Sequence, residues 1–266
     1  MTEKNILEKF NESRFRAVCE ETLHSMEQYQ VPGVAVGISF QDQEWSAGFG
    51  TTNIEHPLPV DEDTLFQIGS ITKTFLATVV MRLVDIGQLE LDQPVRTYLP
   101  GLKLKDESVA ARVTLRHLLT HTGGWVGDYF ADCGMGDDAV ERIVEQMADL
   151  EQLTPLGDVW SYNNSGFYLA GHIIEVITGK SFETALKELL LDPLDLQMSF
   201  FFAQDVITHR FVVGHEVIDG QVKVARPWAI GRSAHPAGGI ICGVKNLLRY
   251  ALFIWVMEQL PMAPGC

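Results

Sequence analysis

The stretch from Ser70 to Ile86 is largely apolar and contains no glycine or proline before Gly87. A run of this length and composition predicts a long buried helix that begins at Ser70. Positions i and i+3 of a helix lie on the same face, about 5–6 Å apart, so the Lys73 side chain is expected beside the Ser70 hydroxyl. The sequence therefore predicts a basic group within reach of a serine proton.

Two interpretations of this Ser-x-x-Lys pair are open. Ser70 can be a helix N-cap, with Lys73 a solvated residue of the first turn. Alternatively, Lys73 holds or removes the proton of a nucleophilic Ser70. The first interpretation is weakened because the helix dipole favours acids in a first turn. In addition, no other serine of this chain has a lysine three residues later.

The overall composition narrows the class of partner. The chain has 266 residues, of which 46% are hydrophobic, and a net charge of −15. This is typical of a globular chain with one large domain or two small ones. The negative charge argues against binding to nucleic acid or an anionic membrane, so a small-molecule partner is expected. The N-terminal stretch lacks the apolar core of a secretory signal and no segment resembles a membrane span, so we expect a cytoplasmic protein.

The cysteines have no Cys-x-x-Cys spacing, which argues against a zinc ribbon, a redox motif or a disulfide framework. We expect ordinary thiols at all four positions, Cys19, Cys133, Cys242 and Cys266.

Hydrophobic periodicity and turn residues predict the remaining secondary structure. Asp219 and Gly220 form a dipeptide typical of a tight hairpin turn. The predicted elements are an amphipathic helix at 4–29, a hairpin at 33–50, helices at 114–120, 138–150, 165–177 and 181–190, a second hairpin at 211–228 and an apolar helix at 243–260.

Several common catalytic motifs are absent from the chain. There is no Gly-x-Ser-x-Gly elbow and no His-Glu-x-x-His. The string TGKS lacks the glycine loop of a P-loop and is better interpreted as a helix C-cap at Gly179 and an N-cap at Ser181. His117 and His121 have the spacing of two metal ligands, but no nearby acid or cysteine completes a site. A metallohydrolase is therefore a weaker alternative than two histidines bonded to the backbone around a turn.

A second motif, Tyr162-x-Asn164, lies in PLGDVWSYNNSGFYLAGHIIE. Alone it can be a helix-entry loop in which Asn163, Asn164 or Ser165 is the cap. Together with FQIGSITKTF, it resembles the serine β-lactamase and penicillin-recognising superfamily, particularly class C enzymes, family VIII-type esterases and D-aminopeptidases. The resemblance extends in order and approximate spacing to LRHLLTHTGG, LDPLDLQMSFF and AGGIICGVKNLLRYALF, and it covers nearly the whole chain.

This resemblance implies a role for each motif residue. Ser70 would be the nucleophile, and Lys73 would take its proton once burial and a second cation lower the lysine pKa from about 10.4. Tyr162 would relay the proton between Ser70, Lys73 and the leaving group. Asn164 would orient Lys73 and bind the substrate. No metal or organic cofactor is required.

The third motif of the family, a Lys-Thr-Gly or His-x-Gly strand, is not found after the helix at 243–260. HTG at 121–123 precedes Tyr162, and HPAGG at 235–239 leads into the following helix, so neither is taken as a substitute. The resemblance thus implies that the C-terminal sheet strands are missing, together with one backbone donor of the oxyanion hole. An exposed edge on the hairpin at 33–50 would then favour self-association.

These observations predict an α+β, β-lactamase-like fold in which helices flank an antiparallel sheet and an all-helical region is inserted. The expected domains are a sheet region of residues 1–75 and 211–266 and a helical region of 76–210. The expected function is that of a serine hydrolase that forms an acyl-enzyme with a small ester, amide or β-lactam, weakly if the third motif is absent. The alternative is a truncated or degenerate member that binds or assembles without efficient catalysis.

Overall fold

The computed structural model describes residues 13–41, 43–228 and 230–259. The chain forms two compact units. The first, here called the sheet unit, is drawn from Met1–Gln67, Leu196–Ala229 and Ile241–Cys266, and the second, the helical unit, is Ile68–Asp195 with Ile230–Ile240. The predicted domains, 1–75 with 211–266 and 76–210, stay a prediction because compactness alone does not show that a part folds by itself.

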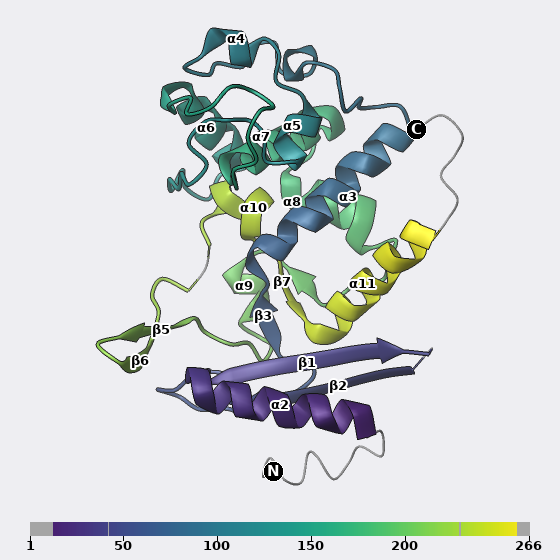
Figure 1. Ribbon diagram of the computed structural model, residues 1–266, viewed down its shortest axis with the longest axis vertical. Helices are drawn as coiled ribbons and strands as arrows, with labels where there is room; N and C mark the ends of the chain where they lie inside the picture. The colour runs from purple at the N-terminus through teal and green to yellow at the C-terminus, as the bar shows by residue number, and fades with distance from the viewer. Residues whose placement is uncertain (1–12, 42, 229, 260–266) are drawn as a thin grey trace. The chain divides into compact units, whose positions relative to one another are not determined.

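The sheet unit is built around the first predicted hairpin. Strands β1 (Gly33–Phe40) and β2 (Gln43–Gly50) pair antiparallel along their whole length. Helix α2 (Ser13–Tyr29) lies along this hairpin (Figure 1). Residues 4–12 of the predicted first helix lie outside the described residues. The apolar contacts between α2 and the hairpin form a small core of Phe15, Cys19, Ala47 and Phe49, with Leu23, Met26, Val36, Ile38 and Trp45 around it.

Helix α11 (Val244–Gln259) packs on the same hairpin through a glycine. A Cβ atom built at Gly37 would lie 2.6 Å from Leu248 Cδ1, which is shorter than any normal contact. The absence of a side chain at Gly37 thus lets α11 approach β1 closely. The predicted helix at 243–260 is confirmed over the residues that the structure describes.

Two further antiparallel sheets complete the sheet unit. One has the strand order β3 (Leu65–Gln67), β7 (Ile241–Gly243) and β4 (Ser199–Phe200). The other pairs β5 (His215–Ile218) with β6 (Gln221–Val224). Positive φ angles of 53° at Asp219 and 74° at Gly220 form the turn between these two strands. The second predicted hairpin is thereby confirmed, although it is shorter than residues 211–228.

The helical unit contains the helices predicted for the middle of the chain. The predicted helix at 138–150 is α-helical only to Gln146 and then becomes a 3₁₀ turn, and the predicted helix at 181–190 changes at Lys187 into a π-helical turn. A 3₁₀ turn is common at the end of a helix, whereas a π-helical turn is rare. The principal elements are α3 (Thr72–Asp85), α5 (Leu115–Leu119), α6 (Ala139–Gln146), α7 (Ser165–Thr178), α8 (Phe182–Leu186) and α10 (His235–Gly238).

The helix boundaries at TGKS follow the predicted caps. Gly179 ends α7 with a left-handed φ of 67°, a conformation that glycine adopts easily because it has no Cβ atom. The Ser181 Oγ atom accepts the Thr184 amide at 3.4 Å and begins α8. The TGKS string is therefore a helix junction. Within the described residues, none of the helices is both long and apolar enough to cross a bilayer.

Candidate active site

Ser70 lies in a single 3₁₀ turn, η1 (Gly69–Ile71), that leads into α3. The N-cap position of α3 is Ile71, and no side chain caps that end of the helix. The interpretation of Ser70 as an N-cap is therefore wrong. Instead, Lys73 Nζ donates a hydrogen bond to Ser70 Oγ at 3.0 Å. The hydroxyl is on an exposed residue, whereas Lys73 is only 5% exposed.

Lys73 is a buried cation that is surrounded by neutral acceptors and aromatic rings. Its Nζ atom donates to the Ala237 carbonyl at 2.7 Å. The same atom lies 4.9 Å from the centre of the Tyr162 ring and 5.5 Å from that of Phe167. Burial lowers the pKa of Lys73 below its ordinary value, although Tyr162 and the nearby Asp128 carboxylate oppose this shift. A larger neutral fraction makes the amine a better proton acceptor.

His121 supports the ring of Tyr162. The two rings stack with centroids 4.6 Å apart and an interplanar angle of 28°. His121 Nδ1 accepts the backbone N–H of Asn163 at 3.0 Å, and the residue has a positive φ of 58°. Burial and the charge of Lys73 lower the pKa of His121. Sequence reasoning did not assign this contact, because only the fold brings residue 121 beside residue 162.

The two asparagines after Tyr162 have different contacts. Asn163 Oδ1 accepts the Gly166 amide at 2.7 Å, so this residue caps the entry to α7, as the helix-entry interpretation predicts for one of the three candidates. Asn164 Nδ2 donates to Asp128 Oδ1 at 2.9 Å. Among the described residues, the hydrogen bond of the Asn164 amide is therefore with Asp128.

The Ala237 carbonyl belongs to the HPAGG segment, to which the sequence interpretation gave little weight. Its helix, α10, packs against α3 and α7 (Figure 1). Just beyond α10, the Ile240 amide donates to Thr72 Oγ1 at 3.1 Å and the Ile240 carbonyl accepts the Ile68 amide at 3.0 Å. The segment is thus bonded to both sides of Ser70. No sequence signal identifies this carbonyl, because every residue carries one.

His117 and His121 are not arranged as a pair of metal ligands. Their Nδ1 atoms accept the backbone amides of Thr114 and Asn163, at 3.2 and 3.0 Å. Among the residues that the structure describes, no three His, Cys, Asp or Glu side chains form a group suited to a metal ion. Both histidines therefore have the backbone-bonded arrangement that was the other sequence interpretation.

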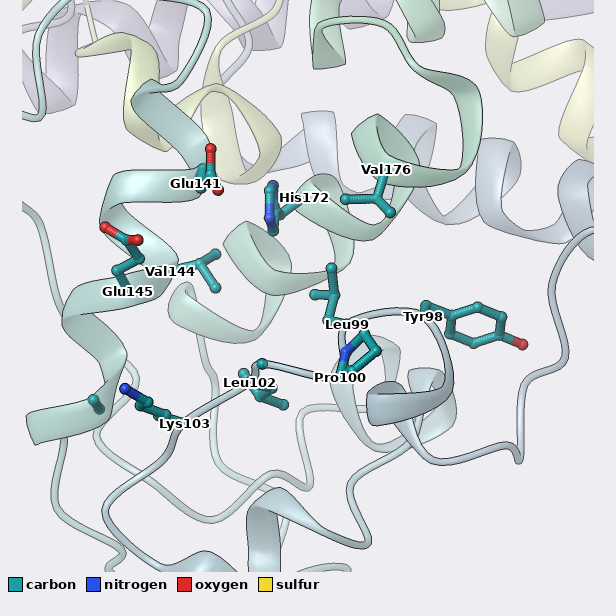
Figure 2. A pocket seen from close by; sticks show the side chains of 12 residues that line it. Tyr98, Leu99, Pro100, Leu102, Lys103, Glu141, Val144, Glu145, His172 and Val176 are labelled. Carbon is teal, nitrogen blue, oxygen red and sulfur yellow. The ribbon is translucent and has the colours of Figure 1, made fainter.

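A pocket of about 780 Å³ elsewhere in the helical unit lacks the chemistry of the Ser70 site (Figure 2). It lies between α6, α7 and the loop at 98–103, and its lining includes no serine or cysteine. His172, which projects into it, is paired with Glu175 at 3.1 Å. None of the four predicted site residues lines this pocket, so the Ser70 site is the stronger candidate for catalysis.

Comparison with known proteins gives a consistent set of relatives. Residues 20–263 match the family model described as Beta-lactamase. Penicillin-binding protein 4 of Amycolatopsis lactamdurans is 35% identical over 84% of this chain and 59% of its own length. Esterase EstB of Burkholderia gladioli is 31% identical over 80% of this chain and 56% of its own. The octameric penicillin-binding protein homologue from Pyrococcus abyssi superposes with a TM-score of 0.78 at 29% identity, over 91% of this chain and 56% of that one. The chain thus spans less than two thirds of each relative.

Proposed function

The chain belongs to the beta-lactamase family, and on this premise we propose that it is a serine hydrolase that forms an acyl-enzyme through Ser70. The observation that carries the proposal is the 3.0 Å contact between Lys73 Nζ and Ser70 Oγ, made by a lysine whose pKa is lowered by burial. A hydroxyl becomes a useful nucleophile when a neighbouring base accepts its proton. The substrate would be a small molecule with an ester, amide or β-lactam carbonyl.

In the proposed acylation, Ser70 Oγ attacks the carbonyl carbon while its proton moves to the neutral Lys73 amine. The carbonyl electron pair moves to oxygen, where the Ser70 backbone N–H would be one donor of the oxyanion hole. Collapse of this intermediate breaks the bond to the leaving group. Tyr162 gives the leaving group a proton and regains one from the Lys73 ammonium, and water later hydrolyses the Ser70 ester by the reverse proton path.

Asn164 and Asp128 would border the substrate side of this site. Their hydrogen bond, at 2.9 Å, holds the amide of Asn164 in place. The remaining amide hydrogen and the amide oxygen can then bind a polar group next to the scissile carbonyl. In this proposal Asn164 acts on the substrate, and the positioning of Lys73 is left to Ser70, Tyr162 and Ala237.

A second candidate function is a binding or assembly module without efficient turnover. The relative from Pyrococcus abyssi is octameric, which supports self-association as part of this alternative. The two candidates differ in what they require of Ser70, because only the hydrolase needs an activated hydroxyl.

The experiment is labelling with a fluorophosphonate, followed by peptide mass spectrometry. We expect one adduct, on the peptide that contains Ser70, and none after Ser70→Ala. Ser161→Ala is the matched control, since Ser161 is an exposed serine next to Tyr162, and it should label as the native chain does. An unlabelled native chain, or an adduct on another serine, would refute the hydrolase and favour the binding module.

A further inference from the structure

A buried cluster of charged groups lies at the start of α10. Glu183 of α8 accepts two hydrogen bonds from Arg232, at 3.1 Å each, and is 2.7 Å from His235 Nδ1. The side chains of these three residues are 8%, 9% and 2% exposed. Burial alone would raise the pKa of Glu183, but the bonds to His235 and Arg232 lower it to about 2. The carboxylate is therefore charged throughout the physiological range.

Residues 232 and 233, just before α10, also bind the loop at 131–137. Arg232 donates to the Met135 carbonyl at 2.8 Å and pairs with Asp137 at 2.7 Å. Ser233 Oγ donates to the Ala131 carbonyl at 2.6 Å. Removing one member of a buried ion pair leaves an uncompensated charge and is strongly destabilising. The cluster thus fixes the residues before α10 to two other parts of the helical unit.

Helix α10 is too short to maintain its own geometry. A helix of four residues is far below the length at which isolated helices are stable, so its position depends on tertiary contacts. His235 is its first residue and Ala237 its third. On one side Pro236 packs so closely on α7 that a Cβ atom at Gly171 would lie 2.5 Å from the proline Cβ. The charge cluster and this contact together determine where the Ala237 carbonyl points.

The position of that carbonyl decides how the neutral Lys73 amine is rotated. A neutral amine has two N–H donors and one lone pair, and a carbonyl oxygen can only accept. If one hydrogen goes to the Ala237 carbonyl and the other is directed to the side of the neighbouring Tyr162, the lone pair faces Ser70 Oγ. In this orientation the amine can take the serine proton. Without the carbonyl, the amine can rotate and direct an N–H bond at Ser70 instead.

We propose that Glu183, with His235 and Arg232, is a positioning group for catalysis, because it holds α10 so that the Ala237 carbonyl directs the Lys73 lone pair toward Ser70. This inference rests on the proposed function. Glu183 does not touch the reacting atoms and acts through Ala237 and Lys73. Loss of its charge should therefore change the chemical step and leave substrate binding nearly unchanged.

The test is Glu183→Gln, which keeps the size of the side chain and removes its charge. We expect the limiting rate constant of fluorophosphonate labelling to fall by up to about 10²-fold, the typical effect of a small displacement of catalytic groups. The reagent concentration at half-maximal rate should stay the same. The rate constant is read from the time course and the folded fraction from the amplitude, so partial unfolding does not imitate the effect.

The pH profile separates positioning from general destabilisation. A hydrogen bond from the charged amine to a carbonyl raises the pKa of Lys73, so its loss should lower that pKa and move the acid limb of labelling to lower pH. The other charged or titratable groups near Lys73 are Tyr162, Asp128 and His121, and the variant leaves all three in place.

Substitutions at two neighbouring residues of α7 provide a second test and a control. Gly171→Ala introduces a methyl group against Pro236 without any change of charge, and it should also slow labelling. His172→Gln is the matched control. It breaks the His172–Glu175 pair, whose histidine lines the pocket of Figure 2, and it should leave the rate and the pH profile unchanged.

The outcomes distinguish the two proposals. If the native chain is labelled, and Glu183→Gln and Gly171→Ala are labelled equally fast with the native pH profile, the positioning role is refuted while the hydrolase stands. If the native chain is not labelled, the proposed function itself fails.

Discussion

The helical unit contains two buried cations with opposite electrostatic environments. Lys73 contacts a hydroxyl, a carbonyl and aromatic rings, and burial lowers its pKa. Arg232 contacts the carboxylates of Glu183 and Asp137. Burial alone would lower the pKa of Arg232, but these two carboxylates raise it. A buried cation with neutral partners can thus lose its proton, whereas one with carboxylate partners is locked in its charged form.

This difference indicates how one small unit can combine a reactive site with a rigid support. The guanidinium is suited to the support, since it stays protonated and bonds a carboxylate through two parallel N–H groups. The ammonium of lysine shifts its pKa readily when it is buried. If the kind of partner, rather than burial alone, decides which cation is reactive, substitutions at Lys73 should mainly change the rate and substitutions at Arg232 should mainly change the stability.

The largest expected effect is that of Lys73→Met. The acylation rate should fall by roughly 10²–10⁴, the usual contribution of a positioned acid or base. The melting temperature should not fall, because no carboxylate is left without its partner. Labelling kinetics and thermal unfolding would measure the two quantities. Adding Tyr162→Phe should cost little more, since both groups serve one proton path, and strict additivity would contradict their proposed cooperation.

Next in size is the effect of Arg232→Met on stability. The free energy of unfolding should fall by about 3–5 kcal/mol, because Glu183 becomes a buried charge without its guanidinium. The double variant Arg232→Met/Glu183→Leu should recover part of this loss, because it removes the buried carboxylate that the single variant leaves without its guanidinium. Urea denaturation measures both. If the double variant is less stable than the single one, the loss of stability comes from the missing interactions of the two side chains and not from an unpaired buried charge.

A smaller change is expected from Asp128→Asn. The Asp128 carboxylate raises the pKa of Lys73, so its removal should lower that pKa and increase the neutral fraction of the amine at acidic pH. The acid limb of acylation should move to lower pH, with a rate increase there of less than about tenfold, the equivalent of one pKa unit. The pH dependence of labelling checks this, and a shift to higher pH would contradict the sign. The new amide oxygen can still accept from Asn164.

The smallest effect is expected at an exposed ion pair of the same unit. Arg116 binds Asp92 through two hydrogen bonds of 2.7 and 2.8 Å, but their side chains are 56% and 69% exposed. Arg116→Ala should change the free energy of unfolding by no more than about 1 kcal/mol. If urea denaturation shows a loss of stability as large as that of Arg232→Met, burial does not decide how much each arginine contributes to stability.

Local sequence signals predicted much of this structure correctly. The contact between Ser70 and Lys73 followed from a three-residue spacing, and the Asp219–Gly220 turn and the Gly179 cap followed from residues that tolerate positive φ. The α+β class with antiparallel pairing is confirmed, and the likeness to known members confirms the β-lactamase-like fold.

Contacts across long sequence separations were not predictable in the same way. The Ala237 carbonyl is 164 residues from Lys73, and a backbone acceptor has no side-chain signature. The cluster joins Glu183 and His235 across 52 residues. For Asn164, the family resemblance predicted that it orients Lys73 and binds the substrate, which stays a prediction, whereas its hydrogen bond with Asp128 had no signal in the sequence.

Because each unit contains buried cysteines, the rate of thiol modification can report how fast that unit opens. Burial raises the pKa of Cys19 to about 11 and that of Cys242 to about 12, and only the thiolate reacts rapidly with a maleimide. These two thiols belong to the sheet unit and should be modified only as fast as that unit opens. Cys133 is buried in the helical unit, and its modification rate should report how fast that unit opens. In a Cys266→Ser background, which removes a thiol outside the described residues, the three modification half-lives would reveal which unit opens first.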